Sequence, residues 1–90
     1  MDFKTAVEYV NGRIAKKNLT DRDRTFLYGM YKQANFGNAP AARPVLSQET
    51  VFASMKWLSW KKFYGVSKQH AEQMYCAHVA QMRIRDGDDS

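Results

Sequence analysis

The sequence predicts an all-α domain built from four helices. Apolar residues recur at intervals of three and four along four separate stretches of the chain. Residues that commonly cap helices stand before three of these stretches, at Asp2, Thr20 and Ser67. No segment alternates apolar and polar residues over any length, as a half-buried strand would. With 90 residues, the chain is long enough for one domain with one hydrophobic core.

The first two predicted helices follow Asp2 and Thr20. In the first, one apolar stripe consists of Phe3, Ala6, Val7, Val10 and Ile14. Residues 16–19 are interpreted as a connection. The second helix has Thr20 as its N-cap and stops at Gly37, because glycine accepts the left-handed conformation that often ends a helix.

A long loop and two further helices complete the prediction. Residues 38–48 contain Pro40 and Pro44 with little periodicity, and so long an ordered loop in a small domain is often functional. The third helix is expected to begin near Glu49 or Thr50 and to end near Gly65. Its predicted apolar stripe is Val51, Phe52, Met55 and Leu58, and could include one tryptophan.

The fourth predicted helix begins after Ser67 and carries a long apolar stripe. The stripe consists of Ala71, Met74, Tyr75, His78, Val79 and Met82. Arg83 and Arg85 near its end complement the negative end of the helix dipole.

The charge is unevenly distributed. The formal net charge is +5, and three acids, Asp86, Asp88 and Asp89, lie in the last five residues, which are expected to fray. Without them the chain carries 14 basic and six acidic side chains, a net charge of +8. Such a surface attracts phosphates, nucleotides, nucleic acid or acidic lipid. We place the domain at residues 1–86 and an acidic tail at residues 87–90.

The chain is predicted to be a soluble cytoplasmic protein. Its lone cysteine, Cys76, excludes an intrachain disulfide and favours a reducing compartment. No apolar run approaches the roughly 20 residues that a membrane span needs. The N-terminus also lacks the apolar block of a secretory signal.

Catalytic signals are missing from the sequence. It contains no glycine-rich phosphate loop, no nucleophile elbow and no histidine or cysteine cluster at metal-ligand spacing. Cys76 and His78 are two residues apart, so on a helix they point about 160° from each other. We interpret Cys76 as a packing residue and His78 as a core-edge or surface residue. No catalytic residue, metal or cofactor is predicted.

One helical face combines aromatic rings with a cation. Tyr28 and Lys32 are four residues apart and are offset by about 40°, while Tyr31 lies about 60° to the other side of Tyr28. This face suits a ligand with a flat ring and a phosphate. Aromatic residues at such a spacing are more often core residues, however, so the face alone leaves both interpretations open.

The longer stretch around this face resembles a known family signature. Residues 26–37 read Phe-Leu-Tyr-Gly-Met-Tyr-Lys-Gln-Ala-Asn-Phe-Gly, which is similar to the signature of the acyl-CoA-binding protein family. Further matches to the family pattern are Phe3, Ala6, Arg43-Pro44, Lys56-Trp57-Leu58-Ser59-Trp60, Gly65-Val66-Ser67 and Tyr75. The resemblance covers about residues 3 to 82, with the motifs in the family's order.

This resemblance implies an up-down-down-up four-helix bundle, with the long loop between its second and third helices, that holds one long-chain fatty acyl-CoA. The residues corresponding to Tyr28 and Lys32 contact the adenine end and its 3′-phosphate in that family, and Tyr31 corresponds to a neighbouring tyrosine. The residue matching Lys56 faces the phosphates, and the one matching Tyr75 borders the ligand.

The sequence also departs from the family pattern. Asn11 replaces a first-helix lysine that often contacts the ligand, and Arg13 is the nearest basic substitute. We therefore include Asn11 and Arg13 as further candidate ligand-binding residues. The glycine that commonly follows Arg-Pro is Val45, and Ala53-Ser54-Met55 replaces a Gly-Lys-Ala before Lys56.

The leading hypothesis is an intracellular carrier that buffers and delivers long-chain acyl-CoA without chemical change. It is expected to be a monomer that meets acyl-CoA-using enzymes or membranes transiently and binds no nucleic acid. The alternative is a small basic helical module that binds nucleic acid or an acidic protein. Against this alternative, the basic residues are spread over four helices, with no clustered recognition helix.

Overall fold

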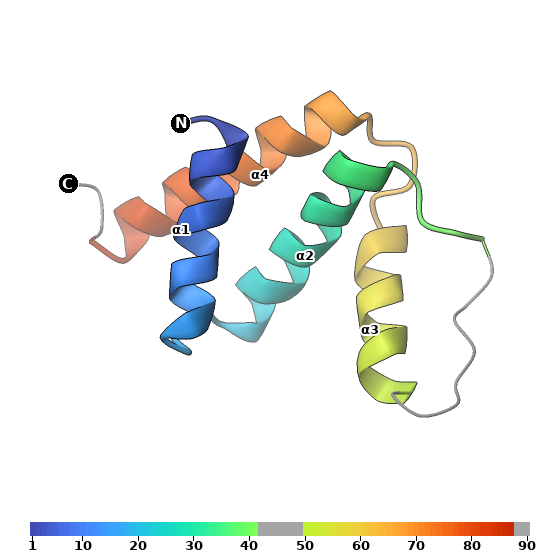
Figure 1. Ribbon diagram of the computed structural model, residues 1–90, viewed down its shortest axis with the longest axis horizontal. Helices are drawn as coiled ribbons and strands as arrows, with labels where there is room; N and C mark the ends of the chain where they lie inside the picture. Colours follow the sequence, from blue (N-terminus) through green and yellow to red (C-terminus); the bar gives the residue numbers. More distant parts are fainter. Residues whose placement is uncertain (42–49, 88–90) are drawn as a thin grey trace.

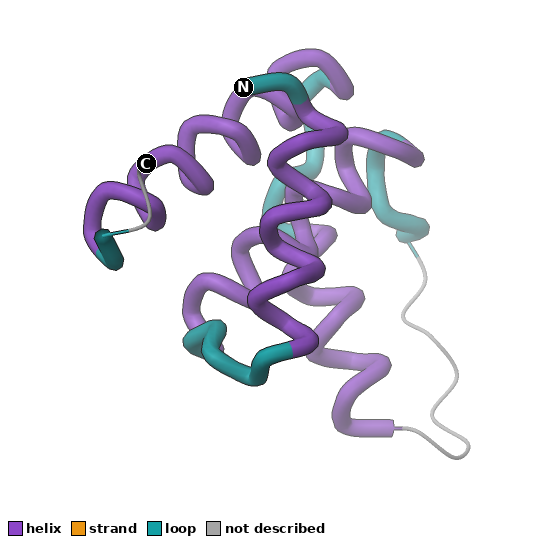
Figure 2. Tube along the Cα trace, turned by 60° about the vertical axis from the view of Figure 1, so that its left-hand side comes forward, coloured by secondary structure: helices purple, strands orange, loops and turns teal. Residues whose placement is uncertain are grey.

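The computed structural model describes residues 1–41 and 50–87, and the side chains of residues 50–54 lie outside that description. Its helices are α1 (Phe3–Ala15), α2 (Asp21–Phe36), α3 (Thr50–Lys61) and α4 (Lys68–Arg85). No strand occurs within these ranges, and the predicted all-α four-helix fold is confirmed (Figures 1 and 2). In the same ranges, no helix is long and apolar enough to cross a membrane.

The three predicted N-caps are confirmed. The Asp2 carboxylate accepts a hydrogen bond from the Thr5 backbone N–H at 2.8 Å. The hydroxyls of Thr20 and Ser67 accept equivalent bonds, each 3.1 Å long, at the starts of α2 and α4. Each bond satisfies a backbone donor that has no partner inside its helix. At the other end of α2, Gly37 adopts a φ of 79°, which explains the glycine there.

The hydrophobic core is shared by α1, α2 and α4. Helix α2 packs against both α3 and α4, while α1 crosses α4 (Figure 1). The buried cluster consists of Ala6, Val10, Leu19, Leu27, Met30, Ala34, Ala71, Tyr75, Val79 and Met82. None of the α3 residues with described side chains belongs to it. Helix α3 is therefore attached to the core through its contact with α2.

The orientation of α3 differs from the sequence prediction. Met55 and Leu58 were expected in its buried stripe, but they are 50% and 48% exposed, whereas Trp57 is buried. The indole N–H of Trp57 donates to the Pro40 carbonyl at 2.9 Å, and that of Trp60 donates to the Gly37 carbonyl at 2.7 Å. An indole has more apolar surface to bury and a donor that needs an acceptor, so the tryptophans set the inward face.

Helix α3 is shorter at its C-terminal end than the sequence predicted. The helix ends at Lys61 rather than near Gly65, and single turns continue the chain, with the Phe63 N–H donating to the Trp60 carbonyl at 3.1 Å. The predicted loop at residues 38–48 is described only as far as residue 41. Its Arg43-Pro44 motif, together with the side chains of Val51 and Phe52, lies outside the described residues.

Helices α2 and α3 approach each other at Gly29. A Cβ atom built on this glycine would overlap the Ser59 carbonyl oxygen and lie 2.6 Å from the Phe63 ring. Only glycine leaves enough space for this approach. Four residues further along α2, the buried Gln33 amide donates to Asn38 Oδ1 at 2.9 Å and to the Val66 carbonyl at 2.8 Å. The contact at Gly29 thus brings α2 and α3 close together, and the bonds of Gln33 join α2 to the segment between α3 and α4.

Candidate functional site

Two lysines and three aromatic rings meet where α2 and α3 pack together. The Lys32 ammonium lies 4.6 Å from the centre of the Phe36 ring, 5.2 Å from Trp60 and 5.9 Å from Tyr28. From α3, the Lys56 ammonium lies 5.6 Å from the centre of the same Tyr28 ring. We call these five residues the cationic cluster. The sequence predicted three of its members, Tyr28, Lys32 and Lys56, as ligand-binding residues.

The cationic cluster is suited to an anion. Among the described residues, no carboxylate is paired with either ammonium. Each lysine carries three N–H donors, which ring faces attract but do not saturate. Burial raises the pKa of Tyr28, so its phenol stays neutral at physiological pH and can donate a hydrogen bond. Two cations and one phenol therefore offer donors to a phosphate.

Tyr31 belongs to a different group of rings. It stacks on Phe3 with ring centres 6.2 Å apart, and Phe3 meets Tyr75 edge to face at 5.2 Å. Tyr31 therefore has ring partners other than those of Tyr28 and Lys32, and its expected place with them on one ligand-binding face stays a prediction. The partners differ because Tyr31 lies toward Phe3 of α1, whereas Lys32 lies toward Trp60 of α3. Tyr75 is only 2% exposed, and burial raises the pKa of its hydroxyl far above the usual range.

The two candidate residues on α1 have different surroundings. Asn11 is exposed. Arg13 donates to the side chain and the carbonyl of Asn18, each at 2.8 Å, and to the Tyr9 hydroxyl at 3.0 Å. It also pairs with Asp86 at 2.9 Å. In this structure Arg13 thus joins the end of α1 to its loop and to the end of α4, and a ligand role for either residue stays a prediction.

Asp86 is not part of a frayed tail. Its carboxylate pairs with Arg13 and also with Arg85, whose Nε lies 2.9 Å away. Hydrogen bonds from Arg85 and Arg13 lower the pKa of Asp86 to about 2. Counting Asp86 with the folded body leaves 14 basic and seven acidic side chains up to residue 87, a net charge of +7 rather than +8. Asp88 and Asp89 lie outside the described residues.

The sequence analysis did not predict a buried ionic group that joins α2 and α4. The Asp23 side chain, 3% exposed, accepts hydrogen bonds from His78 at 2.9 Å and from Arg85 at 2.8 Å. From the sequence, Asp23 was predicted only as part of the start of the second helix. No local sequence pattern indicates its partners His78 and Arg85, which lie 55 and 62 residues further along the chain. His78 is half-buried at the edge of the core, as predicted.

The lone cysteine has the packing role that the sequence indicated. Cys76 is half-buried against the core, and burial raises the pKa of its thiol, which disfavours the reactive thiolate. His78 is engaged with Asp23. Within the described ranges, no three histidine, cysteine or acidic side chains come together in a way that could hold a metal ion.

The fold is a small helical bundle, and its cationic cluster gathers lysines and aromatic rings in an arrangement suited to an anion. Comparison with known proteins identifies the family: residues 1–79 match the family model described as acyl CoA binding protein, and the chain belongs to that family. The recognised family resemblance is thereby confirmed. Members are binding proteins and not enzymes, and they take acyl-CoA as a ligand without a cofactor.

Individual relatives agree with this assignment. The chain is 32% identical over 81 residues to acyl-CoA-binding domain-containing protein 1 of Oryza sativa subsp. japonica, covering 90% of this chain and 85% of that protein. It is 33% identical over 82 residues to acyl-CoA-binding domain-containing protein 3 of the same organism, but spans only half of that protein's length. The crystal structure of Oryza sativa acyl-CoA-binding protein 2 superposes with a TM-score of 0.74 at 26% identity, covering 98% of both chains.

Proposed function

We propose that this chain binds long-chain fatty acyl-CoA with high affinity and serves as an intracellular carrier of these esters. The observation that carries the proposal is that the ammonium groups of Lys32 and Lys56 lie 5.9 Å and 5.6 Å from the centre of the same Tyr28 ring. An aromatic ring can contact an adenine ring, and two cations near it can pair with the phosphates attached to the adenine nucleotide. Family membership supports acyl-CoA as the ligand class.

Each candidate residue has a part in the proposed complex. Lys32 and Lys56 attract the phosphates of the CoA head group, and Tyr28 contacts its adenine end. Tyr31 and Tyr75 border the ligand next to Phe3, which touches both rings. Asn11 and Arg13 are further candidates, and Arg13 would have to exchange one of its present hydrogen bonds for a ligand contact.

The acyl chain supplies most of the binding free energy in this proposal. Burial is worth ~0.8 kcal/mol per methylene, so about 14 methylenes provide roughly 11 kcal/mol before the costs of association. A net value near that size corresponds to a dissociation constant of about 10 nM. Two lysines add a few kcal/mol at most against phosphate at an effective dielectric constant of about 20. The lysines therefore select the head group, while chain length sets the affinity.

A carrier role follows from binding without catalysis. We infer a cytoplasmic monomer that takes up acyl-CoA and releases it to acyl-CoA-using enzymes or to membranes through transient encounters. The reducing compartment is supported by the single cysteine, which sits half-buried in the core.

Calorimetry with three ligands tests the proposal. Palmitoyl-CoA is expected to bind one molecule per chain with a dissociation constant in the nanomolar range. Free CoA and free palmitate, which each lack one half of the ligand, are expected to bind at least 100-fold more weakly, because each gives up one of the two contributions. If palmitoyl-CoA does not bind at micromolar protein concentration, the proposal is wrong. A gel shift with duplex DNA that disappears at high salt would instead favour a nucleic-acid module.

A further inference from the structure

One aromatic ring of the cationic cluster lies outside the hydrophobic core. Phe36, the last residue of α2, is 61% exposed and belongs neither to the buried cluster nor to the apolar side chains packed against it. An exposed ring of this size gives up the stabilisation that burial would provide. The reason for a phenylalanine at this position therefore lies in its neighbours outside the core.

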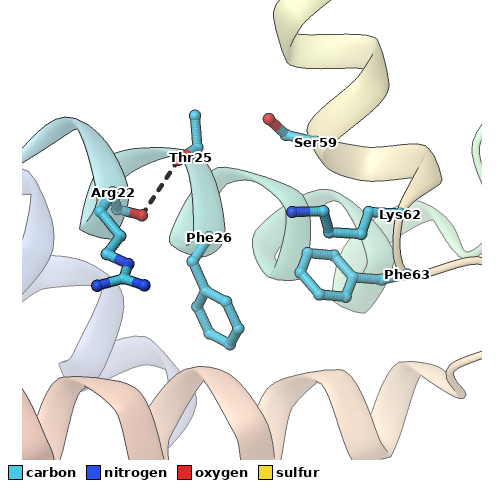
Figure 3. A pocket seen from close by; sticks show the side chains of 6 residues that line it. All are labelled: Arg22, Thr25, Phe26, Ser59, Lys62 and Phe63. Carbon is cyan, nitrogen blue, oxygen red and sulfur yellow. Dashed lines mark hydrogen bonds between the residues drawn. The ribbon is translucent and has the colours of Figure 1, made fainter.

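The other phenylalanine of α2 provides a contrast. Phe26 is half-buried, and its ring stacks on His78 at 4.5 Å and meets Phe63 edge to face at 5.4 Å. Figure 3 shows Phe26 and Phe63 in the wall of an open cavity of about 330 Å³ between α2 and α3. Phe26 thus packs helices together, which is a role that the exposed Phe36 does not share.

The Phe36 ring lies near a cation and an indole. The Lys32 ammonium is 4.6 Å from the centre of the Phe36 ring, compared with 5.2 Å from Trp60 and 5.9 Å from Tyr28. Lys32 and Phe36 are four residues apart on α2, and residues at this spacing are neighbours on a helix surface. The ring centres of Phe36 and Trp60 are 6.2 Å apart. Phe36 is therefore the ring closest to the Lys32 charge.

The backbone at the end of α2 fixes the second ring. The indole N–H of Trp60 donates to the carbonyl of Gly37, the residue directly after Phe36, at 2.7 Å. This bond holds the indole against the end of α2. The faces of both rings attract the same ammonium, because an aromatic ring carries negative charge density on its faces.

Aromatic rings hold a cation without using its hydrogen-bond donors. In the part of the chain that the structure describes, no carboxylate is paired with Lys32. A carboxylate would neutralise the ammonium, whereas ring faces leave its three N–H donors available to a ligand. A lysine side chain also loses rotamer freedom when it binds, and this cost falls if the side chain is already ordered.

We propose that Phe36 is a positioning residue, which holds the Lys32 ammonium ready for a phosphate of the ligand. A phosphate then draws the ammonium from one defined place rather than from many rotamers in water. The inference rests on the proposed function, which is binding of acyl-CoA at the cationic cluster. It adds to that function a residue that acts through Lys32.

Calorimetry with palmitoyl-CoA tests this role. Phe36→Leu keeps an apolar side chain and a good helix former but removes the ring, and is expected to weaken binding about fivefold. Phe36→Tyr keeps the ring and is expected to bind within about twofold of the wild type. Tyr64→Leu, which removes a 69% exposed ring outside the cationic cluster, is the control and should also stay within about twofold.

A double-mutant cycle separates positioning from direct contact with the ligand. In a chain that already carries Lys32→Ala, adding Phe36→Leu is expected to change affinity by less than about twofold, because the side chain through which Phe36 acts is gone. A further loss of about fivefold in this background would show that Phe36 contacts the ligand itself, and would overturn the positioning role.

Proton NMR checks the arrangement without ligand. The ε-methylene protons of Lys32 are expected upfield of those of the exposed Lys16, since nearby ring faces shield them. Phe36→Leu should reduce this displacement, and Phe36→Tyr should preserve it. Equal shifts for Lys32 and Lys16 in the wild type would overturn the inference.

The outcomes also distinguish this inference from the proposed function. If the wild type binds palmitoyl-CoA and Phe36→Leu binds it equally well, or if Tyr64→Leu loses as much, only the positioning role fails. If the wild type does not bind palmitoyl-CoA, the proposed function fails and the positioning role fails with it.

Discussion

His78 on α4 holds its Nε2 atom 2.9 Å from Oδ1 of Asp23 on α2, 55 residues earlier in the chain. Because an ionised carboxylate can only accept, Nε2 carries the proton in this bond. The other carboxylate oxygen accepts from Arg85 at 2.8 Å, and the His78 ring stacks on Phe26 at 4.5 Å. A nearly buried charge thus links the two helices that contribute most to the core.

This link predicts an acid-sensitive stability. Burial alone would raise the pKa of Asp23, but hydrogen bonds from Arg85 and His78 outweigh burial and lower the pKa to about 2. A carboxyl whose pKa is lower in the folded than in the unfolded state stabilises the fold above about pH 4, and this contribution disappears as the pH falls towards about 2. The predicted loss is about 2 kcal/mol, measured by urea unfolding at pH 5 and at pH 2.5.

The variant Asp23→Asn is expected to lower the unfolding free energy at pH 5 by about 2 to 4 kcal/mol, since it leaves buried donors without their charged acceptor. It should also reduce the difference between pH 5 and pH 2.5. Asp21→Asn, an exposed acid two residues away, is the control and is expected to change neither quantity by more than about 0.5 kcal/mol. An equal acid response in wild type and Asp23→Asn would contradict the assignment.

Two glycine substitutions are expected to have opposite effects. Gly29→Ala places a methyl group against the Ser59 carbonyl and the Phe63 ring, and should destabilise the fold by about 1 to 3 kcal/mol. Gly12→Ala, where nothing lies within 4 Å of the new methyl group, should stabilise α1 by up to about 1 kcal/mol. Thermal unfolding measures both. A stabilised Gly29→Ala variant would show that α2 and α3 are not in close contact at this point.

The cationic cluster predicts the residues that bind the CoA head group. Lys32→Ala and Tyr28→Ala are each expected to weaken palmitoyl-CoA binding more than tenfold in calorimetry, with unchanged helical circular dichroism. Lys16→Ala removes an exposed lysine from the α1 end, and should change affinity less than twofold. Near-wild-type affinity in both test variants would refute the residue assignment, even if the chain still binds acyl-CoA.

Trp60 should report ligand binding by fluorescence. The Lys32 ammonium lies 5.2 Å from the centre of its ring, so a phosphate that draws Lys32 away changes the electrostatic field at the indole. We expect palmitoyl-CoA to shift or quench the emission of the wild type and of Trp57→Phe, but to have little effect on Trp60→Phe. Trp57, which bonds to Pro40 and lies beneath Lys61, is the matched control. A full signal in Trp60→Phe would place the ligand elsewhere.

Local patterns in the sequence predicted most of the helices correctly. The caps at Asp2, Thr20 and Ser67 depend on contacts within three residues, so spacing alone is enough to find them. The apolar stripe of α4 was also predictable, because Ala71, Tyr75, Val79 and Met82 recur at helical spacing and are all buried. In α3 the same method failed, since both Met55 and the tryptophans recur at helical spacing. Spacing cannot say which face meets α2.

The sequence by itself determined four helices, their caps and, through the family signature, the residues expected at the ligand. Only the tertiary structure decided how those residues are grouped. In the structure Tyr28 and Lys32 lie near Lys56 of α3, whereas Tyr31 stacks on Phe3 of α1. Yet Tyr28, Tyr31 and Lys32 all lie within an arc of about 100° around α2. The physical reason is that packing against two different neighbours divides one helical face, and contacts between helices are invisible in local periodicity. The same holds for Asp23, whose partners are joined to it only by the fold.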